Sequence, residues 1–206
     1  MKITHLKHAS FLIQGKKNIY IDPYKLKGDL PLADIILITH SHFDHCSPDD
    51  IAKIRDNNTN IIATRDCSIQ SPFTTINQGE KIDVDDVKIT AVPAYNVNKD
   101  FHPKSKNWVG YIVEAEGIKI YHSGDTDVIE EMENFNVDIA LLPVGGTYTM
   151  DVEQALEAVK KLSPRMVIPM HFGEVVGSMN DALNFCRKCA VECKVLNPYE
   201  EWEVNI

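Results

Sequence analysis

The chain has 206 residues, of which 44% are hydrophobic and 25% are charged, and its formal net charge at pH 7 is −9. This balance is typical of a globular protein and excludes the disordered and fibrous classes. No apolar run approaches the ~20 residues that a membrane span needs. The length predicts a single domain over residues 1–206, and the acidic charge disfavours nucleic acid as a partner.

The chain opens directly on a strand pattern rather than on a secretory signal, and it has five cysteines, an odd number. Both features favour a cytoplasmic protein with free thiols. Cys186, Cys189 and Cys193 have the spacing of a metal knuckle, but structural zinc needs four ligands. We therefore expect these three cysteines to be buried thiols of a helix, with the metal knuckle as the alternative.

Short strands with tight turns are expected in the first third of the chain. They cover residues 2–6, 9–14 and 18–22, and the loop Pro23–Ala33 separates them from a wholly apolar strand at 34–39. Ser47 followed by Pro48 predicts the start of a helix.

The rest of the chain changes from strands to alternating strands and helices. Strands are expected at 60–64, 87–92, 108–115, 118–122, 137–142 and 165–170, with a turn at Glu116-Gly117. Helices are expected near 127–133, at 151–162, where Asp151 and Gln154 resemble a capping pair, and at 179–191. This order predicts an α/β protein in which sheets pack together and helices cover the outer faces.

A cluster of metal-binding residue types follows the apolar strand directly. His40, His42, Asp44 and His45 lie within six residues, and imidazole with carboxylate suits zinc, iron and related metals. Side chains alternate between the two faces of an extended segment, so His40 and His42 point the same way. Asp44 and His45 follow at the start of a helix and can reach a second position next to the first. The pattern predicts two adjacent metal sites. A solvated loop that contains histidine by chance is disfavoured, because three of the chain's eight histidines fall here.

The segment Thr39–His45 resembles the Thr-His-x-His-x-Asp-His motif of the metallo-β-lactamase-fold hydrolase superfamily. His122–Thr126 and Pro169–Gly173 resemble later strand ends of the same superfamily. Lys7–Ile13 and Ile21–Pro23 are similar to the openings of a branch of small members that includes relatives of ascorbate-6-phosphate lactonase. The resemblance implies a four-layer αββα sandwich of two mixed sheets with outer helices.

The resemblance also implies a ligand set. His40 and His42 would hold a first ion, Asp44, His45 and His171 a second, and Asp125 would bridge them. The third histidine of the first site is missing, because the stretch Val92–Asn96 contains none. His122 is the preferred substitute, as a ligand or beside one, and the other candidates are His8, the loop residue His102 and Asn96. The alternative is a weak first site with a partial metal load. Asp22 would either orient a ligand histidine or cap a turn.

The implied cofactor is a divalent metal, one or two ions, with zinc preferred and manganese or iron as alternatives. Metal ions activate water for attack on a carbonyl or phosphoryl centre. Asp44 and Asp125 are the candidate catalytic carboxylates, together with His122. The protein would then be a metal-dependent hydrolase, whereas the alternatives are a non-catalytic metal- or ligand-binding protein and a single-strand nuclease.

A small, anionic ester, lactone or phosphodiester is the expected substrate. The loop from Tyr95 to Trp108 contains three lysines (Lys99, Lys104 and Lys106) against one aspartate, and this local positive charge would attract an anion. A solvated loop that merely carries lysines is the alternative. The candidate substrate-binding residues are Tyr95, Lys104 and Tyr148.

Overall fold

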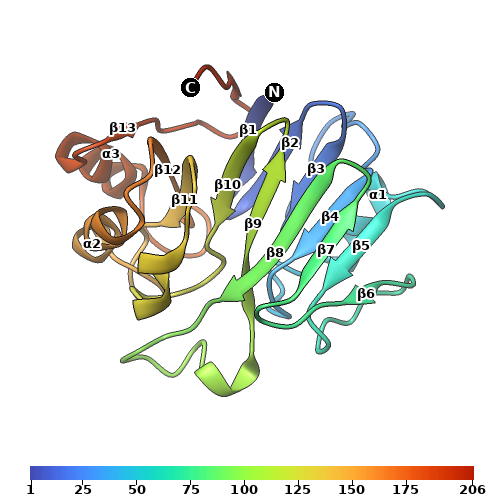
Figure 1. The fold of residues 1–206 in the computed structure, drawn as a ribbon, viewed down its shortest axis with the longest axis horizontal. Coiled ribbons are helices and arrows are strands. Elements are labelled where there is room, and N and C mark those ends of the chain that lie inside the picture. Colours follow the sequence, from blue (N-terminus) through green and yellow to red (C-terminus); the bar gives the residue numbers. More distant parts are fainter. The chain divides into compact units, whose positions relative to one another are not determined.

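The structure, a computed structural model, describes all 206 residues and divides them into two units. The first unit comprises Met1–Ile76 and Leu196–Ile206, and the second comprises Asn77–Val195. Each unit contains one seven-stranded mixed sheet, whose strands are labelled in Figure 1. No helix of the protein combines the length and the apolar character that crossing a membrane requires.

The sheet of the first unit has the strand order β14-β1-β2-β3-β4-β5-β6. The strands are β1 (Lys2–Lys7), β2 (Ser10–Gln14), β3 (Asn18–Ile21), β4 (Ile35–Ile38), β5 (Asn60–Ala63), β6 (Thr74–Thr75) and β14 (Glu201–Glu203). Neighbouring strands are antiparallel from β14 to β3 and parallel from β3 to β6. All four residues of β4 are buried, as its apolar sequence predicts for a central parallel strand.

The single helix of the first unit, α1 (Pro48–Ile54), begins where the sequence predicts it. Ser47 is the N-cap and accepts a hydrogen bond from the Asp50 amide, and Pro48 takes the first helical position, where no amide hydrogen is needed. The buried carboxylate of Asp50 in turn accepts the amides of Lys25 and Leu26 at 2.7 and 3.0 Å. These bonds attach the loop after β3 to the helix.

The sheet of the second unit has the order β13-β12-β11-β10-β9-β8-β7. Its strands are β7 (Lys81–Val84), β8 (Val87–Pro93), β9 (Val109–Ala115), β10 (Ile118–His122), β11 (Ile139–Pro143), β12 (Met166–Met170) and β13 (Glu192–Cys193). The strands from β7 to β10 are antiparallel, and those from β10 to β13 are parallel. The parallel strands need crossover connections, and these contain the helices of the unit.

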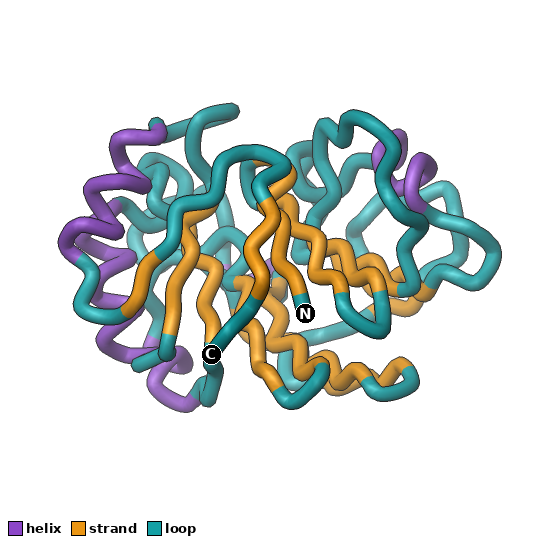
Figure 2. Tube along the Cα trace, turned by 90° about the horizontal axis from the view of Figure 1, so that it is seen from above, coloured by secondary structure: helices purple, strands orange, loops and turns teal.

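The crossovers contain the 3₁₀ helix η2 (Glu130–Asn134) and the α-helices α2 (Val152–Leu162) and α3 (Met179–Lys188). The two α-helices lie side by side in Figure 2, and their apolar faces pack in one core with β11 and β12. The predicted capping pair is confirmed, since Asp151 and Gln154 exchange hydrogen bonds. A further 3₁₀ helix, η1 (Lys104–Lys106), lies in the long loop between β8 and β9.

Some expected elements differ from the structure. The segment predicted as a helix near 127–133 is a short 3₁₀ helix that starts at Glu130, and α3 ends three residues earlier than predicted because Cys189 takes an extended conformation. The strands β6, β7, β13 and β14 were not predicted, because they are short and lack a buried apolar run.

The expectation of three free thiols near the C-terminus is wrong for two of them. Cys186 and Cys193 form a disulfide, and Cys189 is free and half-buried. The physical reason is the early end of α3, after which the chain turns back into β13. This turn brings the Cα atoms of Cys186 and Cys193 within 5.1 Å of each other, a separation that a disulfide can span.

Candidate metal centre

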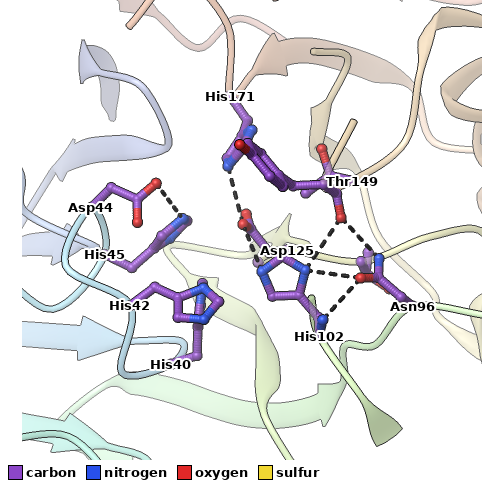
Figure 3. Close-up of polar contacts among 12 residues, drawn as sticks. His40, His42, Asp44, His45, Asn96, His102, Asp125, Thr149 and His171 are labelled. Carbon is purple, nitrogen blue, oxygen red and sulfur yellow. Dashed lines mark hydrogen bonds and ion pairs between the residues drawn. The ribbon is translucent and has the colours of Figure 1, made fainter. Parts of the chain in front are cut away.

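The histidine-rich segment of the first unit leaves the carboxyl end of β4 and turns sharply before α1. The amides of His45 and Cys46 both donate to the carbonyl oxygen of His42, at 3.0 and 2.8 Å. This turn gathers the side chains of the segment at one end of the sheet, as Figure 3 shows for His40, His42, Asp44 and His45. Of these, His40 and His45 are almost completely inaccessible to solvent.

The donor atoms of this segment form two neighbouring groups. Nε2 of His40 lies 3.1 Å from Nδ1 of His42, so these two ring nitrogens lie side by side. Oδ2 of Asp44 lies 3.1 Å from Nε2 of His8 and 3.9 Å from Nε2 of His45. His8, at the turn between β1 and β2, therefore belongs to the cluster rather than to the general core.

The buried carboxylate of Asp22, directly after β3, holds two of these histidines in place. Its Oδ2 lies 2.7 Å from Nδ1 of His45 and 2.6 Å from Oγ1 of Thr39, which is itself 2.9 Å from Nδ1 of His40. A carboxylate can only accept, so Nδ1 of His45 carries the ring proton; the Thr39 hydroxyl donates to Asp22 and accepts from Nδ1 of His40. In both rings Nε2 is then the basic nitrogen, which is the form that binds metal.

In the second unit, Asp125 and His171 meet at the carboxyl ends of parallel strands. Asp125 follows β10 and His171 follows β12, and Nε2 of His171 lies 3.0 Å from Oδ2 of Asp125. Gly145, which follows the intervening strand β11, lies close to the backbone of His171. A Cβ atom at this position would be 2.2 Å from the His171 carbonyl oxygen. The glycine is therefore needed for the approach of these two strand ends.

A third residue joins this group from the loop between β8 and β9. Nε2 of the buried His102 lies 3.1 Å from Oδ2 of Asp125, the same oxygen that His171 contacts (Figure 3). Sequence reasoning named His102 only as one alternative, because nothing in the spacing of a long loop says where it folds. The only available signal was that His102 lies in the loop that follows β8, the strand after which the expected histidine is missing.

The preferred substitute, His122, is fully buried at the end of β10. Its Nδ1 accepts a hydrogen bond from the Gly124 amide at 3.2 Å. A neutral imidazole with an accepting Nδ1 carries its proton on Nε2. His122 is thus held in the opposite tautomer to that of His40 and His45.

The predicted substrate-binding residues Tyr95 and Lys104 contact each other. The Tyr95 hydroxyl donates to Glu131 at 2.9 Å, and Nζ of Lys104 lies 3.1 Å from the same hydroxyl and 3.3 Å from Glu131. These hydrogen bonds to Tyr95 and Glu131 raise the pKa of Lys104, whereas burial is the main cause of the raised pKa of Tyr95. A role for either residue in substrate binding stays a prediction.

The other lysines of the loop are also engaged. Lys99 forms an ion pair with the buried Asp127 and donates to the Thr149 carbonyl oxygen at 3.0 Å. Nζ of Lys106 lies 5.7 Å from the ring centroid of Trp108. The positive charge of the loop is therefore largely balanced by neighbouring carboxylates. Tyr148 packs edge-on against Phe101, with 4.7 Å between ring centroids.

The donor set of each unit fits a divalent metal ion. Two donors that each lie about 2.0–2.1 Å from one tetrahedral ion are separated by about 3.3 Å. The His40–His42, His8–Asp44, His102–Asp125 and His171–Asp125 contacts span 3.0–3.1 Å. Imidazole and carboxylate are the usual ligands of zinc, manganese and iron. The His/Asp cluster could therefore bind metal, and its chemistry leaves the choice of metal open.

Known proteins resemble this chain over nearly its whole length. A family model described as a beta-lactamase superfamily domain matches residues 2–171. A UPF0173 metal-dependent hydrolase of Thermococcus kodakarensis is 38% identical, over 99% of this chain and 100% of that protein. Among solved structures, a chain from Parabacteroides distasonis has a TM-score of 0.84 and 33% identity, covering 95% of this chain and 93% of that one.

Igni18, a metallo hydrolase from the archaeon Ignicoccus hospitalis, has a TM-score of 0.80 and 26% identity, and the match covers 99% of both chains. Together with the two seven-stranded mixed sheets, these similarities confirm the predicted metallo-β-lactamase-like α/β fold.

Proposed function

Because the chain belongs to the beta-lactamase superfamily, among its UPF0173 metal-dependent hydrolases, it is a metal-dependent hydrolase, and we propose that it cleaves a small ester, lactone or phosphodiester. The observation that carries this proposal is the buried network of Asp22, Thr39, His40 and His45. The burial of these polar groups is tolerated because they hydrogen-bond to one another. The network fixes two imidazoles in the tautomer that binds metal through Nε2.

The proposed ligands are those that the sequence motif indicates. As the motif implies, His40 and His42 would hold one ion, Asp44, His45 and His171 would hold a second, and Asp125 would serve both. The spacing of donors within the first unit supports this division, because Nε2 of His40 lies 3.1 Å from Nδ1 of His42, and Oδ2 of Asp44 lies 3.9 Å from Nε2 of His45. We propose zinc as the resident metal, with manganese and iron as the other candidates.

When bound, the metal supplies acidified water and polarises the substrate oxygen. The chain's own residues then position the reactants. Asp44 and Asp125, as ligands, would hold and orient the nucleophile through the metal, and the Asp22 carboxylate keeps the His45 ring from rotating.

The lysines of the Tyr95–Trp108 loop support an anionic substrate less strongly than their number indicates. Lys99 is paired with Asp127, and Lys104 is paired with Glu131. Two of the three positive charges are therefore already neutralised within the protein. We accordingly propose that neutral esters and lactones are hydrolysed at least as well as anionic ones.

Purified protein should first be analysed for metal content and then assayed with p-nitrophenyl acetate, a γ-lactone and bis-p-nitrophenyl phosphate, with and without added zinc or manganese. We expect His42→Ala and Asp44→Ala to lower turnover by more than the roughly 10–100-fold typical of losing an orienting partner. Asp49→Ala, on the exposed side of α1, is the matched control and should keep full activity.

Wild-type activity in both His42→Ala and Asp44→Ala would refute the proposed site. Bound metal without turnover of any substrate would instead support a non-catalytic metal-binding protein. Salt-sensitive binding and cleavage of a short oligonucleotide would support a single-strand nuclease.

A further inference from the structure

The loop between β8 and β9 is folded back on itself so that His102 is held from several sides. The Asn96 amide donates to the His102 carbonyl oxygen at 2.7 Å, and the His102 amide donates to Oδ1 of Asn96 at 2.9 Å. The His102 ring also lies edge-on to the buried Trp108, with 5.6 Å between centroids. The conformation of this loop therefore specifies the position of the His102 imidazole.

The base of the loop is fastened to the strand-end segment that contains Asp125. The buried Asp127 forms an ion pair with Lys99 and accepts the Val97 amide at 2.9 Å. Nδ2 of Asn96 donates to the Tyr148 carbonyl oxygen at 3.0 Å. Each of these contacts lies within the second unit and ties the loop to the neighbours of β10 and β11.

The hydrogen bonds of His102 determine which ring nitrogen carries the proton. Its Nδ1 lies 3.1 Å from Oδ1 of Asn96 and 3.2 Å from the Tyr148 carbonyl oxygen, and both of these atoms are acceptors. The orientation of the Asn96 amide is itself fixed, because its oxygen receives a backbone N–H and its nitrogen donates to a carbonyl. Nδ1 of His102 is therefore a protonated nitrogen, and in the neutral ring Nε2, at 3.1 Å from Asp125, carries the lone pair.

We propose that His102 binds metal through Nε2 and replaces the imidazole that is missing after β8, and that Asn96 is the positioning residue that holds its tautomer. This inference rests on the proposed metal-dependent function. Two imidazole nitrogens, from His102 and His171, lie at 3.1 and 3.0 Å from the same oxygen of Asp125. That arrangement suits one carboxylate oxygen shared by two ions, with one histidine on each ion.

His122 does not fit this role, although it lies nearer in sequence to Asp125. Its Nδ1 accepts the Gly124 amide, which places the proton on Nε2 and leaves no basic nitrogen for a metal. The two candidates thus differ in tautomer, and this difference can be measured directly.

The first experiment uses the zinc-loaded protein with ¹⁵N-labelled histidine, in which long-range nitrogen–proton correlation spectra report the protonated ring nitrogen. We expect a proton on Nδ1 and none on Nε2 for His102, and a proton on Nε2 for His122. A proton on Nε2 of His102 in the zinc-loaded protein would overturn the proposal, because the Asp125 contact would then be a salt bridge without metal.

The second experiment measures zinc stoichiometry and affinity by competition with a chelating dye. We expect His102→Gln to lose one equivalent of zinc or to weaken its binding by more than about 100-fold, and Asn96→Leu to weaken it by roughly 10–100-fold. Asn96→Asp keeps an acceptor for Nδ1 of His102 and should restore most of the affinity. Lys106→Gln, in the same loop, is the control and should bind zinc like the wild type.

The outcomes distinguish the role of His102 from the proposed metal-dependent function. Zinc binding by the wild type that is unchanged in His102→Gln would overturn the role of His102 and leave the proposed function intact. A wild type that binds no zinc, manganese or iron would overturn both. Circular dichroism in the presence of a chelator shows whether each variant is folded, and the tautomer measurement on the wild type needs no variant at all.

Discussion

The carboxylate of Asp22 lies 2.7 Å from Nδ1 of His45, and neither side chain is exposed to solvent. The same carboxylate also accepts the hydroxyl and the amide of Thr39, at 2.6 and 2.8 Å. One buried side chain thereby links the end of β3 to the histidine-rich segment after β4. A cation bound on the far side of the His45 ring, as proposed above, would balance the charge of Asp22.

Asp22→Asn is expected to lower the affinity for zinc by roughly 10–100-fold, because the amide is a weaker acceptor and holds the His45 ring less firmly. Competition with a chelating dye measures this change. Asp34→Asn is the matched control, since Asp34 accepts the Asn18 amide at 2.8 Å within the same unit and contacts no histidine. Equal zinc affinity in the two variants would show that Asp22 has no orienting role.

Asp50 should make the protein sensitive to acid. Burial raises the pKa of its carboxyl group, but hydrogen bonds from Lys53, Ser47 and the amides of Leu26 and Lys25 outweigh burial and lower the pKa below its ordinary value of 3.8. A lowered folded-state pKa contributes stability above the unfolded-state pKa, and this contribution is lost as the pH falls through the folded-state pKa.

Asp50→Asn should therefore lower the free energy of unfolding by about 1–3 kcal/mol at pH 7, since buried backbone amides lose a charged acceptor. The difference from the wild type should shrink as the pH falls below about 4. Urea denaturation of metal-free protein at pH 7 and pH 3 tests both statements. The exposed Asp49, changed to Asn, is the control. A difference that grows at low pH would contradict the assigned direction of the pKa shift.

Tyr121 carries a buried hydroxyl that has no hydrogen-bond partner within the protein, and burial raises its pKa. Its ring packs edge-on against Phe135, with 5.4 Å between centroids. Tyr121→Phe keeps this packing and removes an unsatisfied polar atom. Stability should stay the same or rise by about 1 kcal/mol in chemical denaturation.

The opposite result is expected for Tyr20→Phe, because the Tyr20 hydroxyl donates to the Pro31 carbonyl oxygen at 2.7 Å. That variant should lose about 1 kcal/mol. A loss of equal size in Tyr121→Phe would mean that its hydroxyl has a partner after all, such as an ordered water molecule.

The disulfide between Cys186 and Cys193 should stabilise the second unit. It joins residues seven apart in sequence, and closing so short a loop is worth about 2–3 kcal/mol in the chain-entropy model. A reducing agent should therefore lower the melting temperature of the wild type and of Cys189→Ser, but not that of Cys193→Ser. Alkylation of the unreduced, denatured protein should label three cysteines, namely Cys46, Cys67 and Cys189.

Local sequence patterns were sufficient for much of the fold and for part of the site. The apolar run of β4 and the Ser47-Pro48 pair are signals read within a few residues, and both were predicted correctly. The donors His40 to His45 were equally visible, since a single turn brings them together.

The missing parts depend on contacts between residues far apart in sequence. The approach of His102 to Asp125 depends on a loop held by Asn96 and Lys99. The Cys186–Cys193 disulfide depends on where α3 stops. The three lysines of the loop indicated a positive patch because the carboxylate partners of two of them, Lys99 and Lys104, lie about 30 residues away in sequence. Composition and spacing contain no information on such pairings.

The last residues of the chain complete the sheet that its first residues begin. β14 pairs with β1, and the Tyr199 amide donates to the His5 carbonyl oxygen at 2.7 Å. During synthesis on the ribosome, one edge of β1 therefore stays unpaired until the whole second unit has been made. Nascent or truncated chains that stop before Leu196 would present this open edge to one another, so aggregation during translation should begin there.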